Sequence, residues 1–263
     1  MAADLRADKV SLGLLLGTTV LVFLIDTTVI STFETKTDTS NLVISIFIAI
    51  TIIILLLAIF PVSGAHFNPI ISSSTALIGL LPFPHAIVYI LAQCLGDALG
   101  ALALSDVVNS TIQQTFSLGG CTLSVIAPGC NGPVTMAIAV GQALWLEIIC
   151  TFIFLLSSIW IAFDDRQAKK LGLMVVFTIV GTVIRLLAFI STTVTITKGY
   201  VGPGMNLARS LGLAIVIGGH LWHWHWVLWV GLEIASVAFY LYTKLIPSQH
   251  FMPRVPIMIS RRF

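Results

Sequence analysis

The sequence predicts an all-α membrane protein: a bundle of six transmembrane helices with two re-entrant half-helices in an inverted repeat. Three observations predict it, namely an apolar composition, six long apolar runs, and two short apolar segments at equivalent places in the two halves. Of the 263 residues, 57% are hydrophobic and only 9% are charged, whereas a soluble globular domain carries roughly 25% charged residues. So few charges cannot cover a water-facing surface, and the basic residues form too few clusters with aromatic ones to suggest nucleic-acid binding. The net charge of +2 is too small to indicate an acidic partner.

The six long runs each match the thickness of a bilayer, whose hydrocarbon core of about 30 Å needs about 20 apolar residues per helix. We predict spans at Val10–Ile30, Leu42–Pro61, Ala86–Leu104, Val134–Phe163, Leu171–Thr193 and Trp222–Ile246. The first run is long enough to span and lacks a small-residue cleavage site, so we interpret it as a retained helix rather than a signal peptide. We expect one membrane domain over residues 1–263, with repeat halves at about 10–106 and 134–246 and tails at 1–9 and 247–263.

Basic residues fall unevenly on the two sides of a six-span chain. One side carries, in the two tails and the loop between spans four and five, Arg6, Lys9, Arg166, Lys169, Lys170, Lys244, Arg254, Arg261 and Arg262. The loops of the other side carry only Lys36 and Lys198. This bias predicts that both termini are cytoplasmic. Cys121 and Cys130 then lie outside, where they could form a disulfide if that face meets an oxidising space.

Two shorter apolar segments, Asn68–Leu81 and Asn206–Ile217, follow the second and fifth spans. Each is too short to cross the bilayer, and the residues around their starts repeat: Ser63–Ile70 aligns with Val201–Ala208. Because each half contains an odd number of spans, the second half enters the membrane from the opposite side. The repeat is therefore predicted to be inverted, which points to a pathway at the membrane midplane.

The physics of the two short segments favours a water-filled channel. Asn is a favoured helix N-cap, so each segment is predicted to start a half-helix whose N-terminus points at the midplane. Two facing N-termini, each carrying roughly half a positive charge, make a barrier to cations and protons. The Asn68 and Asn206 amides can donate to a neutral solute, and Arg209, which is costly in an apolar segment, is expected to face water or a partner.

Several stretches carry a resemblance to a known family. They are Ser63–Pro69, Gln93–Ala101, Glu147, Gly204–Gly212 and His225–Gly231. Together they resemble the major intrinsic proteins, the aquaporin and aquaglyceroporin family. The Asn-Pro-Ile motif and the segment Leu118–Thr122 are most similar to the plant X intrinsic proteins.

The resemblance implies a set of pore residues. At the midplane it implies Asn68, Pro69, Ile70, Asn206, Leu207 and Ala208. At an outer selectivity filter it implies Ile48, Val194, Pro203 and Arg209, with Glu147 and His66 as structural supports. Ile48 and Val194 stand where water-selective members have Phe and His, which implies a wider, less polar filter for glycerol, urea, boric acid or hydrogen peroxide, with water as a further candidate. The resemblance also implies a homotetramer in the plasma membrane.

This chain departs from the family pattern at five positions. Leu207 and Leu232 stand where the family has Pro, Ile70 where it has Ala, Leu14 where it has Glu, and Ser210 where X intrinsic proteins have Cys. We expect Ile70 to crowd the midplane.

Other interpretations remain open at this point. Asp26, Asp97, Glu147 and Arg185 could be relay groups of a proton-coupled transporter, or Ile70 and Leu207 could block the pore of a non-conducting protein. Asp26 and Asp97 could also lie near span ends and reach water, and Arg185 could pair with a buried acid.

His66 could be a pH gate rather than a packing residue. The histidines of His220–Trp226 could bind metal, although Trp at a span end is the usual interfacial belt. Gly96 and Gly100 are read as packing residues. No catalytic or cofactor motif appears, so we expect neither an enzyme nor a cofactor or metal.

Overall fold

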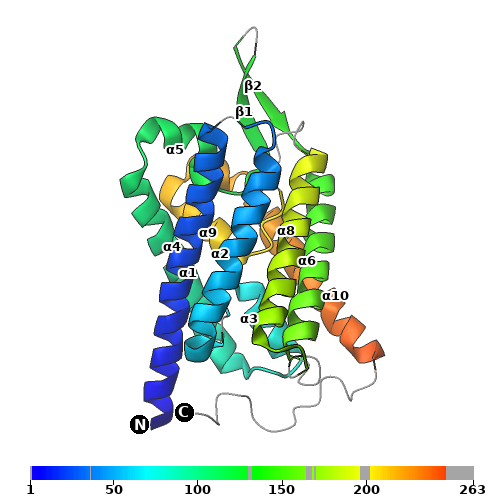
Figure 1. Cartoon of the computed structure of the whole chain (residues 1–263). Helices are drawn as coiled ribbons and strands as arrows, with labels where there is room; N and C mark the ends of the chain where they lie inside the picture. Colours follow the sequence, from blue (N-terminus) through cyan, green and yellow to red (C-terminus); the bar gives the residue numbers. More distant parts are fainter. Residues whose placement is uncertain are drawn as a thin grey trace.

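The structure is a computed structural model that describes residues 2–35, 37–64, 66–129, 132–163, 168, 170–195 and 202–246. In this part of the chain, six helices are long and apolar enough to cross a membrane. They are α1 (Ala2–Glu34), α2 (Ser40–Ser63), α4 (Phe83–Val107), α6 (Val140–Phe163), α8 (Leu173–Thr195) and α10 (His225–Leu245). They run side by side as an upright bundle (Figure 1), so the predicted multi-pass, all-helical class is confirmed.

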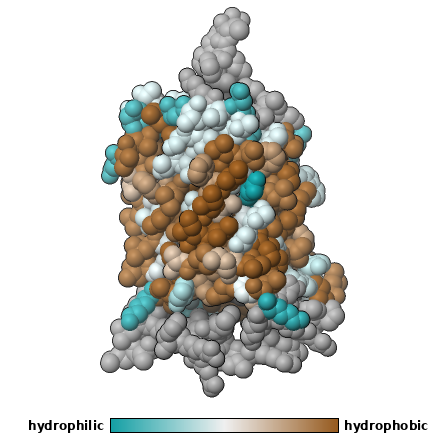
Figure 2. All heavy atoms as spheres, viewed as in Figure 1, coloured by the Kyte–Doolittle hydropathy of each residue, from teal (hydrophilic) through white to brown (hydrophobic). Residues whose placement is uncertain are grey.

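The long helices surround two short ones, α3 (Pro69–Leu77) and α9 (Leu207–Ile217). Around the bundle α4 packs on α1, α1 on α2, α2 on α8, α8 on α6, and α6 on α10, while α3 and α9 contact α4 and α10. The outer surface is hydrophobic, since Leu16, Ile54 and Leu91 are each more than half exposed. Figure 2 shows hydrophobic residues over the middle of the visible face and hydrophilic ones toward its two ends. This pattern is what a lipid-facing bundle requires.

Two glycines let α1 and α4 pack closely. A Cβ at Gly100 would fall 2.6 Å from the carbonyl oxygen of Thr19, and one at Gly96 would collide with the carbonyl of Leu15. Side chains larger than hydrogen are therefore excluded at both positions, as the small-residue spacing predicted. This contact fixes α1 against α4, which in turn packs on α9.

The loop between α4 and α6 differs from the prediction. It contains α5 (Ser110–Phe116), the 3-10 turn η1 (Ser117–Gly119) and a hairpin of β1 (Ser124–Gly129) and β2 (Gly132–Ala137) that projects from one end of the bundle (Figure 1). The strands pair antiparallel from Ser124 opposite Ala137. Our start of the fourth span at Val134 is therefore wrong, because residues 134–137 belong to this hairpin and the helix begins at Val140. The sixth helix likewise begins at His225, after the 3-10 turn η3 (Gly219–Trp222).

Candidate functional site

The two half-helices start at capping asparagines. Asn68 precedes α3, and its side-chain Oδ1 accepts a hydrogen bond of 3.1 Å from the backbone N–H of Ile70. Asn206 precedes α9, and its Oδ1 accepts from the N–H groups of Ala208 at 3.1 Å and Arg209 at 3.4 Å. Both asparagines thus satisfy N–H groups that a helix start leaves open.

The same two side chains tie the half-helices to each other. The Asn68 Nδ2 donates to the carbonyl oxygen of Met205 at 2.5 Å, and the Asn206 Nδ2 donates to the carbonyl oxygen of Phe67 at 3.2 Å. Each asparagine therefore bonds the residue before the opposite one, a reciprocal arrangement that brings the two N-termini together. An amide nitrogen carries two N–H groups, so each side chain keeps a second donor.

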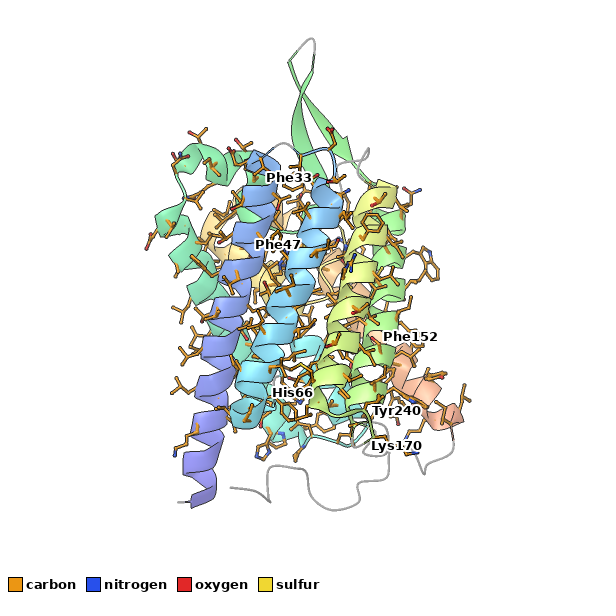
Figure 3. The ribbon with its side chains drawn as sticks, viewed as in Figure 1. Phe33, Phe47, His66, Phe152, Lys170 and Tyr240 are labelled. Atoms are coloured by element: carbon orange, nitrogen blue, oxygen red, sulfur yellow. The ribbon has the colours of Figure 1, made fainter. Side chains whose placement is uncertain are left out.

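A cavity of about 450 Å³ runs along the inside of the bundle. Its wall follows α2 from Asn41 to Gly64, a length of about 35 Å at 1.5 Å per residue. Phe33 and His66 both line it, and Figure 3 places them at opposite ends of the bundle. The cavity is therefore long enough to cross the hydrocarbon core of a membrane.

The wall of this cavity includes polar side chains singled out from the sequence, among them His66, Asn68, Asn206 and Arg209. Most of the remaining wall is apolar, with Ile48, Ile52, Leu56 and Phe60 from α2, Val180, Ile184 and Ala188 from α8, and Leu21, Ile25 and Val29 from α1. A path with few hydrogen-bonding points between apolar walls can pass small neutral molecules, but it offers an ion little to replace its hydration shell.

Of the other three predicted filter residues, Ile48 and Pro203 line the cavity with Arg209, but Val194 does not. Val194 is 68% exposed on the surface of the bundle, so its assignment to the selectivity filter is wrong. Ser191 and Thr192 take that place. The helical period explains why: the lining positions of α8 recur every three or four residues through Ala188, and Val194 lies on a different face.

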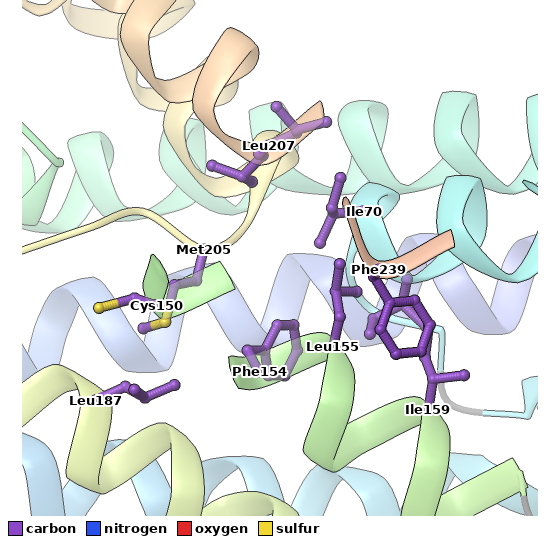
Figure 4. Packing of buried hydrophobic residues seen from close by; sticks show 11 residues of the cluster. Ile70, Cys150, Phe154, Leu155, Ile159, Leu187, Met205, Leu207 and Phe239 are labelled. Atoms are coloured by element: carbon purple, nitrogen blue, oxygen red, sulfur yellow. The ribbon is translucent and has the colours of Figure 1, made fainter. Parts of the chain in front are cut away.

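The midplane residues beside the asparagines do not line the cavity. Ile70 is fully buried and Leu207 is 5% exposed, and both belong to a cluster with Leu155, Leu232 and Phe239. Figure 4 shows Ile70, Leu155, Leu207 and Phe239 among the residues of this cluster. The expectation that Ile70 crowds the midplane is therefore wrong, and a block of the pore by Ile70 and Leu207 is not what the geometry shows. The side chains of Pro69 and Ala208, also predicted at the midplane, are buried outside the cavity wall as well.

Arg209 has a partner that the sequence did not reveal. Its guanidinium donates to Asp26 Oδ1 from Nε at 3.0 Å and from Nη2 at 2.7 Å. The carboxylate belongs to α1 and has no exposed area. Asp97 is equally buried and accepts a hydrogen bond from the N–H of Gly212 in α9. The interpretation that these two acids reach water near span ends is therefore wrong, as is the buried pair suggested for Arg185, which lies exposed on α8.

The turn η1 and the residues just after it complete the surroundings of Arg209. The carbonyl of Gly119 accepts from Nη2 at 2.8 Å, and the Sγ of Cys121 lies 3.1 Å from Nη1. Gly119 has a φ of +80°, and a Cβ there would fall 2.9 Å from the Asp26 Cα, so only glycine brings this carbonyl so close. Cys121 is a buried free thiol, and burial raises its pKa. Its suggested partner Cys130 lies outside the described residues.

Buried polar side chains hold the two re-entrant loops from outside. Glu147 in α6 accepts a hydrogen bond from the N–H of Gly204 at 2.8 Å, which is the contact expected of it. In the first half Leu14 is buried in an apolar cluster, and Gln93 of α4 supports the loop instead: its Nε2 donates to the carbonyl of His66 and to Ser72 Oγ at 3.0 Å. No role of its own was predicted for Gln93 from the sequence. His66 packs here, with Nδ1 3.3 Å from Ser72 Oγ.

The histidines near the start of α10 have structural contacts. His220 Nε2 lies 2.7 Å from Ser117 Oγ and so joins η3 to η1. The rings of Trp222 and His225 meet edge to face, with centroids 5.0 Å apart. These contacts fix η3 against η1 and against the start of α10.

Comparisons with known proteins agree with this geometry. The family model of the major intrinsic proteins matches residues 5–242. Aquaporin-1 of Bos taurus is 32% identical over 227 residues, which cover 84% of this chain and 73% of that protein. Aquaporin PIP1-2 of Musa acuminata subsp. malaccensis is 30% identical over 186 residues, 70% of this chain. The match spans 59% of that plant relative's length.

A solved structure shows the same fold. The aquaglyceroporin from Plasmodium falciparum superposes with a TM-score of 0.71 over 91% of this chain and 96% of that one, at 22% sequence identity. The likeness to plant X intrinsic proteins in particular stays a prediction. Since the family model covers nearly the whole chain and the fold agrees, the chain belongs to the major intrinsic protein family.

Proposed function

We propose that this protein is a passive transmembrane channel for small uncharged solutes. The observation that carries the proposal is the cavity along the whole of α2, with Asn68 and Asn206 on its wall where the two half-helix N-termini meet. The converging helix dipoles disfavour cations and protons at this point, while the free amide N–H groups can donate to a neutral solute. Membership of a channel family supports the same function and argues against an enzyme.

The outer constriction favours solutes that combine polar and apolar faces. Arg209 supplies N–H donors, and the hydroxyl oxygens of Ser191 and Thr192 can accept, since both hydroxyls already donate to backbone carbonyls of α8. Ile48 and Pro203 provide apolar faces. Glycerol, urea, boric acid and hydrogen peroxide fit this chemistry, with water as a further candidate.

The working form is proposed to be a homotetramer with one pore per subunit. The apolar outer surface of the bundle can form the contacts between subunits. The distribution of basic residues supports cytoplasmic termini. The plasma membrane is the proposed location, by likeness to X intrinsic proteins.

Reconstitution in proteoliposomes tests the function. We expect stopped-flow light scattering to show glycerol and urea fluxes that rise linearly with the gradient and are unaffected by membrane voltage. A saturable flux that requires a pH gradient would indicate a proton-coupled transporter instead of a channel. Flux equal to that of empty vesicles would make the protein a non-conducting member of the family.

A further inference from the structure

The guanidinium of Arg209 is held on several sides by the protein. Among the described residues, Nε and Nη2 contact Asp26 Oδ1, Nη2 also contacts the Gly119 carbonyl, and Nη1 contacts Cys121 Sγ. These contacts engage four of the five N–H groups that an arginine carries. The side chain is 13% exposed, so most of it forms part of the wall rather than projecting into the cavity.

Asp26 is fixed at least as firmly as the arginine. Its side chain has no exposed area, and Gly119 lies directly against its backbone. The acid comes from α1 in the first half of the chain, whereas Arg209 comes from α9 in the second half. A buried charge left without its partner is strongly unfavourable, so each of the two holds the other in place.

The pair also changes the electrostatics of the constriction. A lone arginine would place a full positive charge beside the solute, in a narrow space of low dielectric constant. With Asp26 at 2.7 Å the two formal charges cancel over a short distance. A neutral constriction would select by size and by hydrogen bonding, and the exclusion of cations would depend on the paired helix N-termini at the midplane.

We propose that Asp26 is a positioning residue for selectivity: it holds Arg209 against the cavity wall and cancels its charge. The inference rests on the proposed channel function and adds a specificity determinant to it. Without the carboxylate, Arg209 is free to enter the cavity, where it narrows the path for glycerol and attracts anions. A purely structural role for Asp26 would lower the amount of folded protein but would leave the selectivity of each channel unchanged.

The test uses Asp26→Asn in proteoliposomes, with Asp38→Asn as the matched control. Asp38 is an exposed acid outside the spanning helices, so the control removes the same formal charge away from Arg209. We expect Asp26→Asn to lower the ratio of glycerol to water permeability several-fold and to raise chloride flux above that of empty vesicles. Asp38→Asn should keep the wild-type ratio of glycerol to water permeability, and its chloride flux should stay equal to that of empty vesicles. The proposal would be overturned if Asp26→Asn kept the wild-type permeability ratio and showed no chloride flux above that of empty vesicles.

Poor folding of the single variant is covered by the double variant Asp26→Asn/Arg209→Gln, which removes both charges. We expect the double variant to melt at a higher temperature than Asp26→Asn in detergent, because no lone buried charge remains. A double variant no more stable than the single one would contradict the pairing. If the wild-type protein carries none of the proposed solutes, the proposed function fails, and the melting comparison still tests whether Asp26 holds Arg209.

Discussion

Replacing Glu147 tests how the second re-entrant loop is held in position. The fully buried Glu147 accepts a hydrogen bond of 2.8 Å from the backbone N–H of Gly204, two residues before the capping Asn206. Glu147→Ala removes this acceptor and leaves a buried N–H unsatisfied in the loop that positions α9. Glu147→Gln is the matched control, since it keeps a side-chain oxygen at the same distance from the helix but cannot release a proton.

The size of the effect follows from that one bond. A buried donor without a partner costs about 1–3 kcal/mol. For a chain of this length, 1 kcal/mol lowers the melting temperature by roughly 2–4 °C, so we expect Glu147→Ala to melt about 2–12 °C below the wild type. Its glycerol flux should fall too, because a looser loop no longer fixes Asn206 and Arg209 at the cavity. Glu147→Gln should lose less than half as much stability.

Melting is followed by tryptophan fluorescence in detergent, and flux by stopped-flow light scattering at matched protein content. If Glu147→Ala melts and conducts like the wild type, the backbone-support argument is refuted. If Glu147→Gln melts like the wild type but loses its flux, the carboxyl group acts as a proton relay, and the transporter interpretation gains the support that the channel loses.

Three further predictions concern residues in the cavity wall or packed behind it. Thr192→Phe should bring glycerol flux close to that of empty vesicles because Thr192 lines the cavity, whereas Val194→Phe should leave it near wild type; equal effects would show that the wall of α8 is misplaced. Ile70→Ala should lower the melting temperature without raising flux per channel, since its side chain is buried in the cluster with Leu207; a large gain in flux would identify it as a plug instead. Because burial raises the pKa of the Cys121 thiol, iodoacetamide at pH 7.5 should label it far more slowly than a free cysteine peptide, as measured by mass spectrometry of the digested protein. Rapid labelling would mean that Cys121 is an exposed thiolate.

Much of the fold could be predicted because the bilayer imposes a length on every span. The fourth span was placed too early because the apolar residues from Val134 onward continue into α6, and a short apolar strand cannot be told from the start of a buried helix by periodicity alone. The polar helix α5 gave no hydrophobic pattern and so was not expected.

The site was predicted where local chemistry determines it and missed where packing does. Capping by Asn68 and Asn206 follows from residue type at a helix start. Val194 was assigned from the family resemblance, which assumes a length for the loop before Asn206 that the sequence does not give. The burial of Ile70 away from the cavity depends on how α3 is rotated against α6 and α10, which no single sequence reveals.

The partner of Arg209 could have been narrowed down. Charged residues inside membrane segments usually pair or face water, and Asp26 was one of the few acids in the predicted spans. The choice between Asp26, Asp97 and Glu147 required three-dimensional information, because the three acids lie on different helices and the last two bond backbone N–H groups instead.

The central claim is that solutes travel through the cavity along α2, and bulky substitutions on two faces of that helix test it most directly. Ile52 lines the cavity, whereas Ile54 is 57% exposed on the outside of the bundle. Glycerol flux into proteoliposomes is compared for Ile52→Trp and Ile54→Trp at equal amounts of folded protein. We expect Ile52→Trp to conduct no better than empty vesicles and Ile54→Trp to conduct like the wild type. Wild-type flux through Ile52→Trp would show that solutes do not pass through this cavity.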